Sequence, residues 1–468
     1  MRKPLPKRVE MDFEGGLSET ITPHAGVTLL IELGRISGVM AAAERCLPAK
    51  QSPKGLEQGQ FVESFVSLSA LGGECIDDFD VLRSDQGLAA MLGYQLPAAS
   101  SARQWLDLFH DAKLLEGRPL QGSFIPQESS RLAALGSVVE RTVHAYVAAL
   151  RPAATVTLDV DAHLVESAKC TALPCYEGFR AYQPLLVSWA ETGLVLADQF
   201  RDGNVPAAEN IKGLVDRAYA ALPARDGGWR VQVRSDSAAY KYEALDHWDG
   251  LGWRFAVSAD MSQSLRREIE ALPPEEWHFW AQEKDGVVRE WAEVPFVPSR
   301  ENEHRDTKPY RYVAVRIRTA QGVLFGDGNT VKHFAVVSND WETDGQALLE
   351  WHRGKAGTIE HVHLVLKDEL AAGVYPSGKF GLAAPAGTHL QPVGTAQSDR
   401  SRQAVSPRAA EASALCHLHA DGQHCPPRPK GVHASGEAGT HVRDQAGSLS
   451  AGSAAMGLLL TLPPQLSF

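Results

Sequence analysis

Apolar residues recur at helical intervals through the first quarter of the chain. In the segments 29–33 and 61–68, leucine, isoleucine, valine and phenylalanine residues are adjacent or three to four positions apart. This spacing places their side chains on one face of a helix. The sequence therefore predicts a helical N-terminal module, residues 1–128, which ends in a linker containing Pro, Gly and Ser at 117–128.

The pattern then changes to short runs rich in β-branched and aliphatic residues. After a helical stretch at 130–150, the runs at 155–159, 185–189 and 194–200 have the composition and length of strands. The Glu-Thr-Gly sequence at 191–193 predicts a tight turn between the last two of them. Three consecutive strands are therefore expected after the first long helix.

A helix and further strands complete this layer. The apolar pattern predicts a helix at 207–222, strands at 230–233 and 255–259, and a helix at 261–272 that ends before a Pro-Pro pair. The order strand, strand, strand, helix, strand is typical of a mixed α/β layer, in which helices flank a sheet.

The stretch 277–339 alternates apolar and polar residues, which predicts a β-rich insertion. Its tryptophans, Trp277, Trp280 and Trp291, have two interpretations. They stack on unpaired bases, or they form the core that a β-rich segment needs; we favour the core.

One more helix is expected after the insertion. Thr358 follows Gly357, a residue that often interrupts helices, and has the side chain of a helix N-cap. The helix is therefore predicted to begin near Thr358 and to run to about Leu370.

Beyond residue 381 the composition changes abruptly. Residues 382–468 are rich in Ala, His, Pro, Gly, Ser and Arg without sustained periodicity, which predicts a low-order tail. With suitable codons, 408–419 read in another frame encodes a basic amphipathic helix. We therefore hypothesise that the tail is translated out of frame, which sequencing of the gene tests. Five tail residues have the composition of a metal cluster, a grouping that is accidental if the frame has changed: Cys416, His417, His419, His424 and Cys425.

Charge and cysteine content narrow the class of protein. The net charge of -11 argues against a general nucleic-acid coat protein, because phosphate binding requires concentrated Lys and Arg, but it allows a locally basic groove. The six cysteines lack close paired spacing and are interpreted as reduced thiols. No apolar run approaches the roughly 18 residues of a spanning helix. A cytoplasmic protein of two or three structural units is expected, with no membrane partner.

Acidic residues in three distant segments carry the candidate chemistry. Asp159 and Asp161 end one strand-like run, Asp236 ends another, and Glu360 lies in the first turn of the expected last helix. Such carboxylates bind hard divalent cations, and Mg²⁺ takes its remaining ligands from water and phosphate. The pattern therefore predicts phosphoryl-transfer chemistry on a polyanion.

These acidic segments and one further block resemble a known family. In order, 158–162 (Leu-Asp-Val-Asp-Ala), 178–185 (Gly-Phe-Arg-Ala-Tyr-Gln-Pro-Leu), 233–237 (Val-Arg-Ser-Asp-Ser) and 357–363 (Gly-Thr-Ile-Glu-His-Val-His) resemble the successive blocks of bacterial insertion-sequence transposases of the DDE class. The likeness runs from about residue 26 to 381. It implies an α/β fold, with an RNase H-like mixed sheet, flanking helices and a catalytic domain at 129–381.

The resemblance also implies an Asp, Asp, Glu triad. Carried over by position, the triad is Asp161, Asp236 and Glu360, which would bind two Mg²⁺ or Mn²⁺ ions. Asp161 is preferred because the family usually has Asp, a small residue and then Thr, although His163 stands in the third place here. Asp159 remains the alternative first metal ligand.

Basic residues near these blocks are candidate contacts to DNA phosphates. Arg353 and Lys355 resemble the basic residues that flank the glutamate in this family, and Arg180 lies in the second block. Lys367 is seven residues after Glu360 and shares its helix face, so it can reach a phosphate. Trp351 stands where relatives often have Tyr. The alternative is a solvated basic face with an exposed aromatic ring.

Two histidines in the last block suggest zinc at first sight. His361 and His363 are two positions apart on a helix, so they point about 200° apart and are poorly placed to chelate one ion. Packing or phosphate contact is the favoured interpretation.

The resemblance implies a transposase that cuts DNA at terminal inverted repeats and joins the freed 3′-hydroxyl ends to target DNA. The partners are then the repeat and target DNA, and a homodimer pairs the two ends, in a nucleoid-associated location. Two other functions remain open: an inactive DNA-binding remnant, and a metal-dependent nuclease of the same fold.

Overall fold

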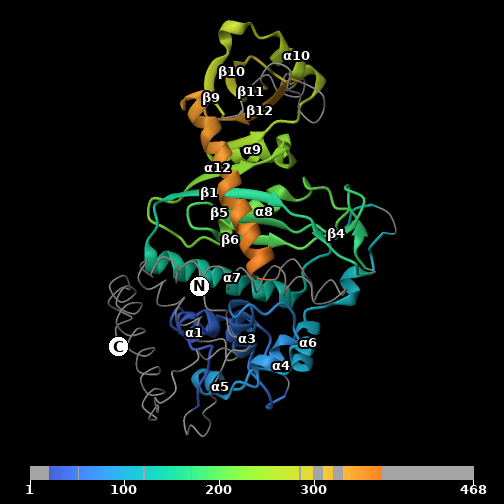
Figure 1. The fold of residues 1–468 in the computed structure, drawn as a ribbon, viewed down its shortest axis with the longest axis vertical. Coiled ribbons are helices and arrows are strands. Elements are labelled where there is room, and N and C mark those ends of the chain that lie inside the picture. Colours follow the sequence, from blue (N-terminus) through green and yellow to red (C-terminus); the bar gives the residue numbers. More distant parts are fainter. Residues whose placement is uncertain are drawn as a thin grey trace, which may run out of the picture. The chain divides into compact units, whose positions relative to one another are not determined.

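The computed structural model describes most of the chain up to residue 370. The described residues are 20–50, 52–119, 122–169, 171–283, 286–298, 309–319 and 330–370. They divide into two compact units (Figure 1). The first unit contains 20–114, 128–151 and 366–370, and the second contains 115–127 and 152–365. The predicted tail and its Cys and His residues lie outside the described part.

The first unit is helical, as the N-terminal periodicity predicts. Its helices are α1 (Val27–Ile36), α2 (Val39–Cys46), α3 (Gln58–Ala70), α4 (Asp78–Leu82), α5 (Gln86–Leu92), α6 (Ala99–Asp107) and α7 (Ser130–Leu150), with a 3-10 turn at Ala112–Leu115. Helix α7 groups with these helices, whereas the sequence assigned it to the following domain.

Aromatic packing and side-chain caps hold these helices. Trp105 is buried and packs on Phe65 and Phe109, with ring centroids 5.5 and 4.8 Å apart. The Ser129 hydroxyl accepts a hydrogen bond from the Leu132 amide at the start of α7, and Asp85 caps α5 in the same way. These caps satisfy backbone donors that the first helical turn leaves unpaired.

The second unit is built on a sheet of nine strands. Their spatial order is β6-β5-β1-β7-β8-β12-β11-β10-β9. The strands are β1 (Thr155–Ala162), β5 (Leu185–Trp189), β6 (Leu194–Gln199), β7 (Arg230–Ser235), β8 (Arg254–Ser258), β9 (His278–Gln282), β10 (Val288–Val294), β11 (Arg311–Arg318) and β12 (Val331–Ser338).

Strand directions identify the sheet as RNase H-like. The first three strands, β1, β5 and β6, are antiparallel neighbours, and β7 and β8 then add in parallel on the other side of β1. Helix α8 (Ile211–Ala220) connects β6 to β7, and α9 (Tyr242–Gly250) connects β7 to β8. A helical crossover is what parallel neighbours require. The mixed α/β fold predicted from the sequence is confirmed.

The β-rich segment continues this sheet. After α10 (Gln263–Ala271), strands β9 to β12 form a meander, and β12 pairs antiparallel with β8. Trp277 is buried, and Trp280 and Trp291 pack against a cluster that includes Val313 and Leu348. The interpretation of these tryptophans as core residues is therefore confirmed.

A small sheet follows β1 directly. Its three strands, in the order β2-β4-β3, are β2 (Val165–Glu166), β4 (Arg180–Tyr182) and β3 (Leu173–Pro174). The His163 amide donates to the Pro184 carbonyl at 3.0 Å, which keeps this region beside the end of β1.

The last core helix begins earlier than the sequence predicted. Helix α12 spans Gly345–Leu364, and the Asp344 side chain caps it by accepting from the amides of Gln346 and Ala347. The prediction of an N-cap at Thr358 is wrong, because Gly357 and Thr358 lie within the helix. Packing of buried residues such as Leu348 outweighs the low helix propensity of glycine. Val365–Glu369 continues as a π-helical turn.

Helix α12 lies lengthwise along the second unit (Figure 1). It contacts β10, β8, β7 and β1, so its two ends rest on different parts of the same sheet. No helix in the described part of the chain has both the length and the apolar character needed to cross a membrane. Cys46, Cys75 and Cys175 are free thiols, as predicted; the other three cysteines lie outside the described residues.

Two glycines in α12 provide a test of this packing. A β-carbon at Gly345 would collide with the indole of Trp291, whereas one at Gly357 meets no described atom within 4 Å. We expect Gly345→Ala to destabilise the protein by about 1–3 kcal/mol through overpacking. Gly357→Ala should stabilise it by up to about 1 kcal/mol, because alanine favours the helix. Urea denaturation midpoints measure both, and equal effects would contradict the docking of α12 described here.

Candidate active site

The pairing of β1 with β7 brings two aspartates to the same edge of the sheet. In this parallel pair, Asp159 lies opposite Arg234 and Val160 opposite Ser235. The next position on each strand is Asp161 and Asp236. Asp236 keeps an extended backbone, with φ -71° and ψ -170°. Because side chains alternate along a strand, Asp161 and Asp236 leave the sheet on the face that carries Asp159 and Arg234.

Asp159 is fully buried and held by protein groups. Arg234 donates from Nε to Asp159 Oδ1 at 2.7 Å and from Nη2 to Oδ2 at 2.9 Å. The Thr358 hydroxyl donates to the same Oδ2. Burial raises the pKa of Asp159, and Arg234 opposes that rise. Both carboxylate oxygens are therefore engaged within the protein.

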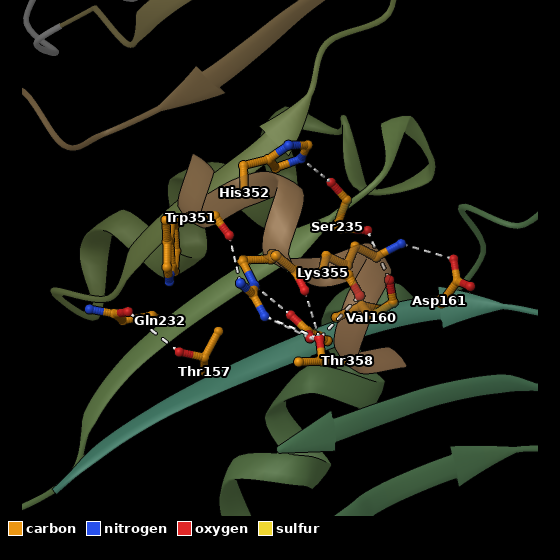
Figure 2. A network of polar contacts seen from close by, with 12 residues as sticks. Thr157, Val160, Asp161, Gln232, Ser235, Trp351, His352, Lys355 and Thr358 are labelled. Carbon is orange, nitrogen blue, oxygen red and sulfur yellow. Dashed lines mark hydrogen bonds and ion pairs between the residues drawn. The ribbon is translucent and has the colours of Figure 1, made fainter. Parts of the chain in front are cut away.

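Arg234 also joins this pair to helix α12. Its Nη1 donates to the Trp351 carbonyl at 2.6 Å, and its Nη2 donates to the Thr358 hydroxyl at 3.2 Å. Figure 2 shows Trp351 and Thr358 on the helix facing this network. A β-carbon at Gly354 would lie 2.7 Å from Arg234 Nη1, so glycine is required where the guanidinium approaches the helix.

Asp161, two residues further along β1, is half-buried and contacts a lysine and a histidine side chain. Lys355 Nζ lies 3.0 Å from Oδ1 and His363 Nε2 lies 3.1 Å from Oδ2. Figure 2 shows the Lys355 side chain extending from α12 toward Asp161. Burial alone would raise the pKa of Asp161, but the hydrogen bond from His363 and the charge of Lys355 outweigh it and leave that pKa below its usual value. Asp161 is therefore a carboxylate at neutral pH.

Asp236 is exposed at the end of β7. Its Oδ1 accepts from the Ala238 amide at 3.1 Å and from the Ser235 hydroxyl at 3.3 Å, which caps the short 3-10 helix Ser237–Ala239. The preceding residue is fixed by α12, since the His352 imidazole bonds the Ser235 carbonyl at 3.0 Å (Figure 2). Burial lowers the pKa of His352 to about 4, so this imidazole is neutral and acts as a donor to the carbonyl.

Glu360 lies on the exposed side of α12. Around the helix it is about 60° from His363 and about 80° from His352, the residues that reach Asp161 and Ser235. Within the part of the chain that the structure describes, no three His, Cys, Asp or Glu side chains gather closely enough to hold a metal ion. The structure thus brings Asp161 and Asp236 to adjacent positions and does not join Glu360 to them.

The predicted basic residues lie in different surroundings. Arg180 is exposed on β4 and donates from Nη1 to the Ala172 carbonyl at 2.8 Å. Arg353 is exposed and lies over the Trp280 ring, 5.6 Å from its centroid. Lys355 pairs with Asp161, and Lys367 is exposed in the π-helical turn.

Trp351 is not an exposed aromatic ring. It packs against the core cluster beneath α12, and Arg254 lies over its ring at 4.3 Å from the centroid. Arg234 lies at 5.5 Å from the same ring. The histidines also separate: His363 is buried against Asp161 and stacks on His163, while His361 is exposed.

Three residues that shape this site were not predicted as site residues, although Thr358 was predicted as a helix N-cap. Arg234 stands inside the second acidic block, Thr358 inside the third, and His352 beside Trp351. A buried strand that contains arginine was the available signal, because an arginine there requires a carboxylate partner. Asp159, at the same position of the neighbouring strand, is that partner.

The donor set fits a hard divalent cation in part. Two carboxylates, Asp161 and Asp236, meet at the carboxyl ends of neighbouring strands, and carboxylate oxygens are the ligands that Mg²⁺ prefers. A third carboxylate would complete the set. Glu360, in the third acidic block of the sequence, is the candidate for it.

Fold and site together define a class of protein: an RNase H-like sheet that presents paired carboxylates from its central parallel strands. The family model described as transposase DDE domain, group 1, matches residues 3–319, and the chain belongs to this family. It is therefore a DDE-class transposase, a class that acts on DNA and uses divalent metal ions. The match includes Asp159, Asp161 and Asp236 and ends before α12. A search of curated proteins found no match.

The contrast between the two aspartates of β1 is testable. Asp159→Ala should lower the free energy of unfolding by about 3–5 kcal/mol, because it leaves the buried Arg234 charge unpaired. Asp161→Ala should lower it by less, because Asp161 is only half-buried and its loss leaves Lys355 on a long stem that can reach solvent. Urea denaturation of the two variants measures this difference, and similar midpoints would mean that Asp159 is not a structural carboxylate.

Proposed function

We propose that this transposase cuts DNA at the terminal inverted repeats of its element and joins the freed 3′-hydroxyl ends to target DNA. The observation that carries the proposal is the adjacent placement of Asp161 and Asp236 in a chain of the DDE transposase family. Asp236 is exposed, and Asp161 is partly exposed, so a polyanionic substrate would have access to this end of the two strands.

Asp161, Asp236 and Glu360 would hold two Mg²⁺ or Mn²⁺ ions. Asp161 is assigned in preference to Asp159 because both oxygens of Asp159 are engaged by Arg234 and Thr358. When bound, such ions activate an attacking water or hydroxyl and stabilise the leaving oxygen. Glu360 is exposed on α12, and its side chain would turn toward the aspartates when the ions bind.

Residues of α12 support the carboxylates. His363 donates a hydrogen bond that orients Asp161, and the neutral His352 holds the carbonyl of the residue before Asp236. Lys355 neutralises Asp161 in the free protein and has a flexible stem, so it can move to a DNA phosphate close to the site.

DNA binding would involve several parts of the chain. The helical N-terminal module, residues 1–128, is proposed to bind the DNA ends. Arg180, Arg353 and Lys367 are proposed to contact phosphates. Two copies would pair the two ends, because strand transfer requires both ends in one complex.

A nuclease of the same fold would use the same carboxylates without joining DNA. The two functions separate in an assay that supplies a cleaved repeat end with a free 3′-hydroxyl and a target plasmid. Joined product supports the transposase, and cleavage without joining supports the nuclease. Neither product would support an inactive remnant.

Removal of Asp236 tests the site directly. We expect Asp236→Ala to abolish Mg²⁺-dependent nicking of labelled terminal-repeat DNA while folding and DNA binding are retained, because an exposed metal ligand adds little stability. Asp226→Ala, another exposed aspartate in a turn, is the matched control and should cut normally. Equal cleavage by the Asp236 variant and the wild type would remove Asp236 from the active site.

Lys367 provides a separate test of phosphate contact. Lys367→Ala should weaken DNA binding and reduce the slope of log affinity against log salt by about one unit, as expected for one lost phosphate contact. Lys367→Arg keeps the charge and should keep the slope. Filter binding at several salt concentrations measures this slope. An unchanged slope in the alanine variant would mean that Lys367 is a solvated surface residue without a phosphate contact.

A further inference from the structure

The buried pair of Asp159 and Arg234 takes no direct part in the proposed chemistry, yet Asp159 lies two residues before Asp161, and Arg234 two residues before Asp236. We propose that Asp159, Arg234 and Thr358 form a positioning network, which sets the rotation and height of α12 over the ends of β1 and β7. The proposal rests on the proposed function, because its purpose is to hold Glu360, Lys355 and His363 at their distances from the metal-binding aspartates.

Arg234 holds the helix at two separated points. It binds the Trp351 carbonyl at 2.6 Å and the Thr358 hydroxyl at 3.2 Å. These residues belong to different turns of α12, and a single rigid guanidinium binds both of them. Because its two nitrogens are fixed relative to each other, the two contacts together resist sliding and rotation of the helix, whereas one contact would allow it to pivot.

The hydroxyl of Thr358 is itself fixed. It lies 3.2 Å from the Gly354 carbonyl and 3.1 Å from the Lys355 carbonyl, while it donates to Asp159. Gly354 provides the space that the guanidinium occupies, at the expense of helix propensity. The local sequence of α12 is therefore adapted to the network.

Stability alone does not account for a buried ion pair of this kind. Desolvation of two charges offsets much of their attraction, and apolar residues of similar volume often serve the fold equally well. The pair instead fixes the orientation of the Arg234 guanidinium. This planar group binds Asp159 through two parallel hydrogen bonds, a geometry that allows few alternatives. Glu360 lies two residues beyond Thr358 in the same helix. Its position therefore depends on how Arg234 and Asp159 hold Thr358.

Thr358→Val is the sharpest test, because it removes one hydroxyl and leaves the Asp159–Arg234 charges paired. Thr142→Val is the matched control: Thr142 is also helical, and its hydroxyl lies close to the carbonyl four residues earlier, as that of Thr358 does. Thr358→Ser keeps the hydroxyl. Each protein is compared with the wild type for Mn²⁺ affinity by electron paramagnetic resonance, for kcat and KM on terminal-repeat DNA, and for melting temperature.

We expect Thr358→Val to lose about tenfold or more in kcat, because small misplacements of catalytic groups have large effects on rate. KM for DNA should stay within twofold, and Mn²⁺ affinity should fall several-fold. The melting temperature should change no more than in Thr142→Val, and Thr358→Ser should restore the rate. Wild-type kcat and Mn²⁺ affinity in Thr358→Val would overturn the proposal.

A second variant removes the charges without leaving one unpaired. Asp159→Leu combined with Arg234→Met should remain folded, yet lose at least as much kcat and Mn²⁺ affinity as Thr358→Val. A folded double variant with wild-type kcat and Mn²⁺ affinity would also overturn the positioning role. If the wild type itself fails to cut terminal-repeat DNA, the proposed function is wrong, and the Mn²⁺ affinities alone decide the inference.

Discussion

The parallel pairing of β1 with β7 is the constraint on which the rest of the structure depends. It sets Asp159 opposite Arg234, and it thereby places Asp161 and Asp236 at the same level two residues later. A shift of one residue in this register would separate the buried charges and turn the aspartates to different faces of the sheet. Fold and site are therefore specified by the same set of backbone hydrogen bonds.

Two carboxylates of one strand consequently have opposite functions. Asp159 is enclosed and paired with Arg234, and Asp161 is partly open and contacts Lys355 and His363. Both aspartates face α12. The helix covers Asp159, and it provides the side chains that form hydrogen bonds with Asp161. Over two residues of β1 the site therefore changes from a buried, hydrogen-bonded carboxylate to an accessible one. Functional sites are commonly supported in this way by a second set of fixed side chains.

Strand and helix types were predictable where the periodicity was strong. The runs at 155–159 and 230–233 became β1 and β7, and the family blocks indicated Asp161 and Asp236. The start of α12 was not predictable from Gly357 and Thr358, because tertiary packing, not local propensity, extends that helix to Gly345. The pairing of Asp159 with Arg234 depends on which residues of β1 and β7 lie opposite each other. This register cannot be read from a single sequence.

The continuity of the nine-stranded sheet has a mechanical consequence. Because β12 pairs with β8, the meander of β9 to β12 belongs to the same sheet as the strands that carry the aspartates. Helix α12 begins against Trp291 of β10 and ends beside Asp161, so it behaves as a stiff rod about 30 Å long with its two ends on opposite halves of the sheet. A bend of the sheet at the β8–β12 junction would therefore be transmitted along the rod as a displacement of Glu360 relative to Asp161.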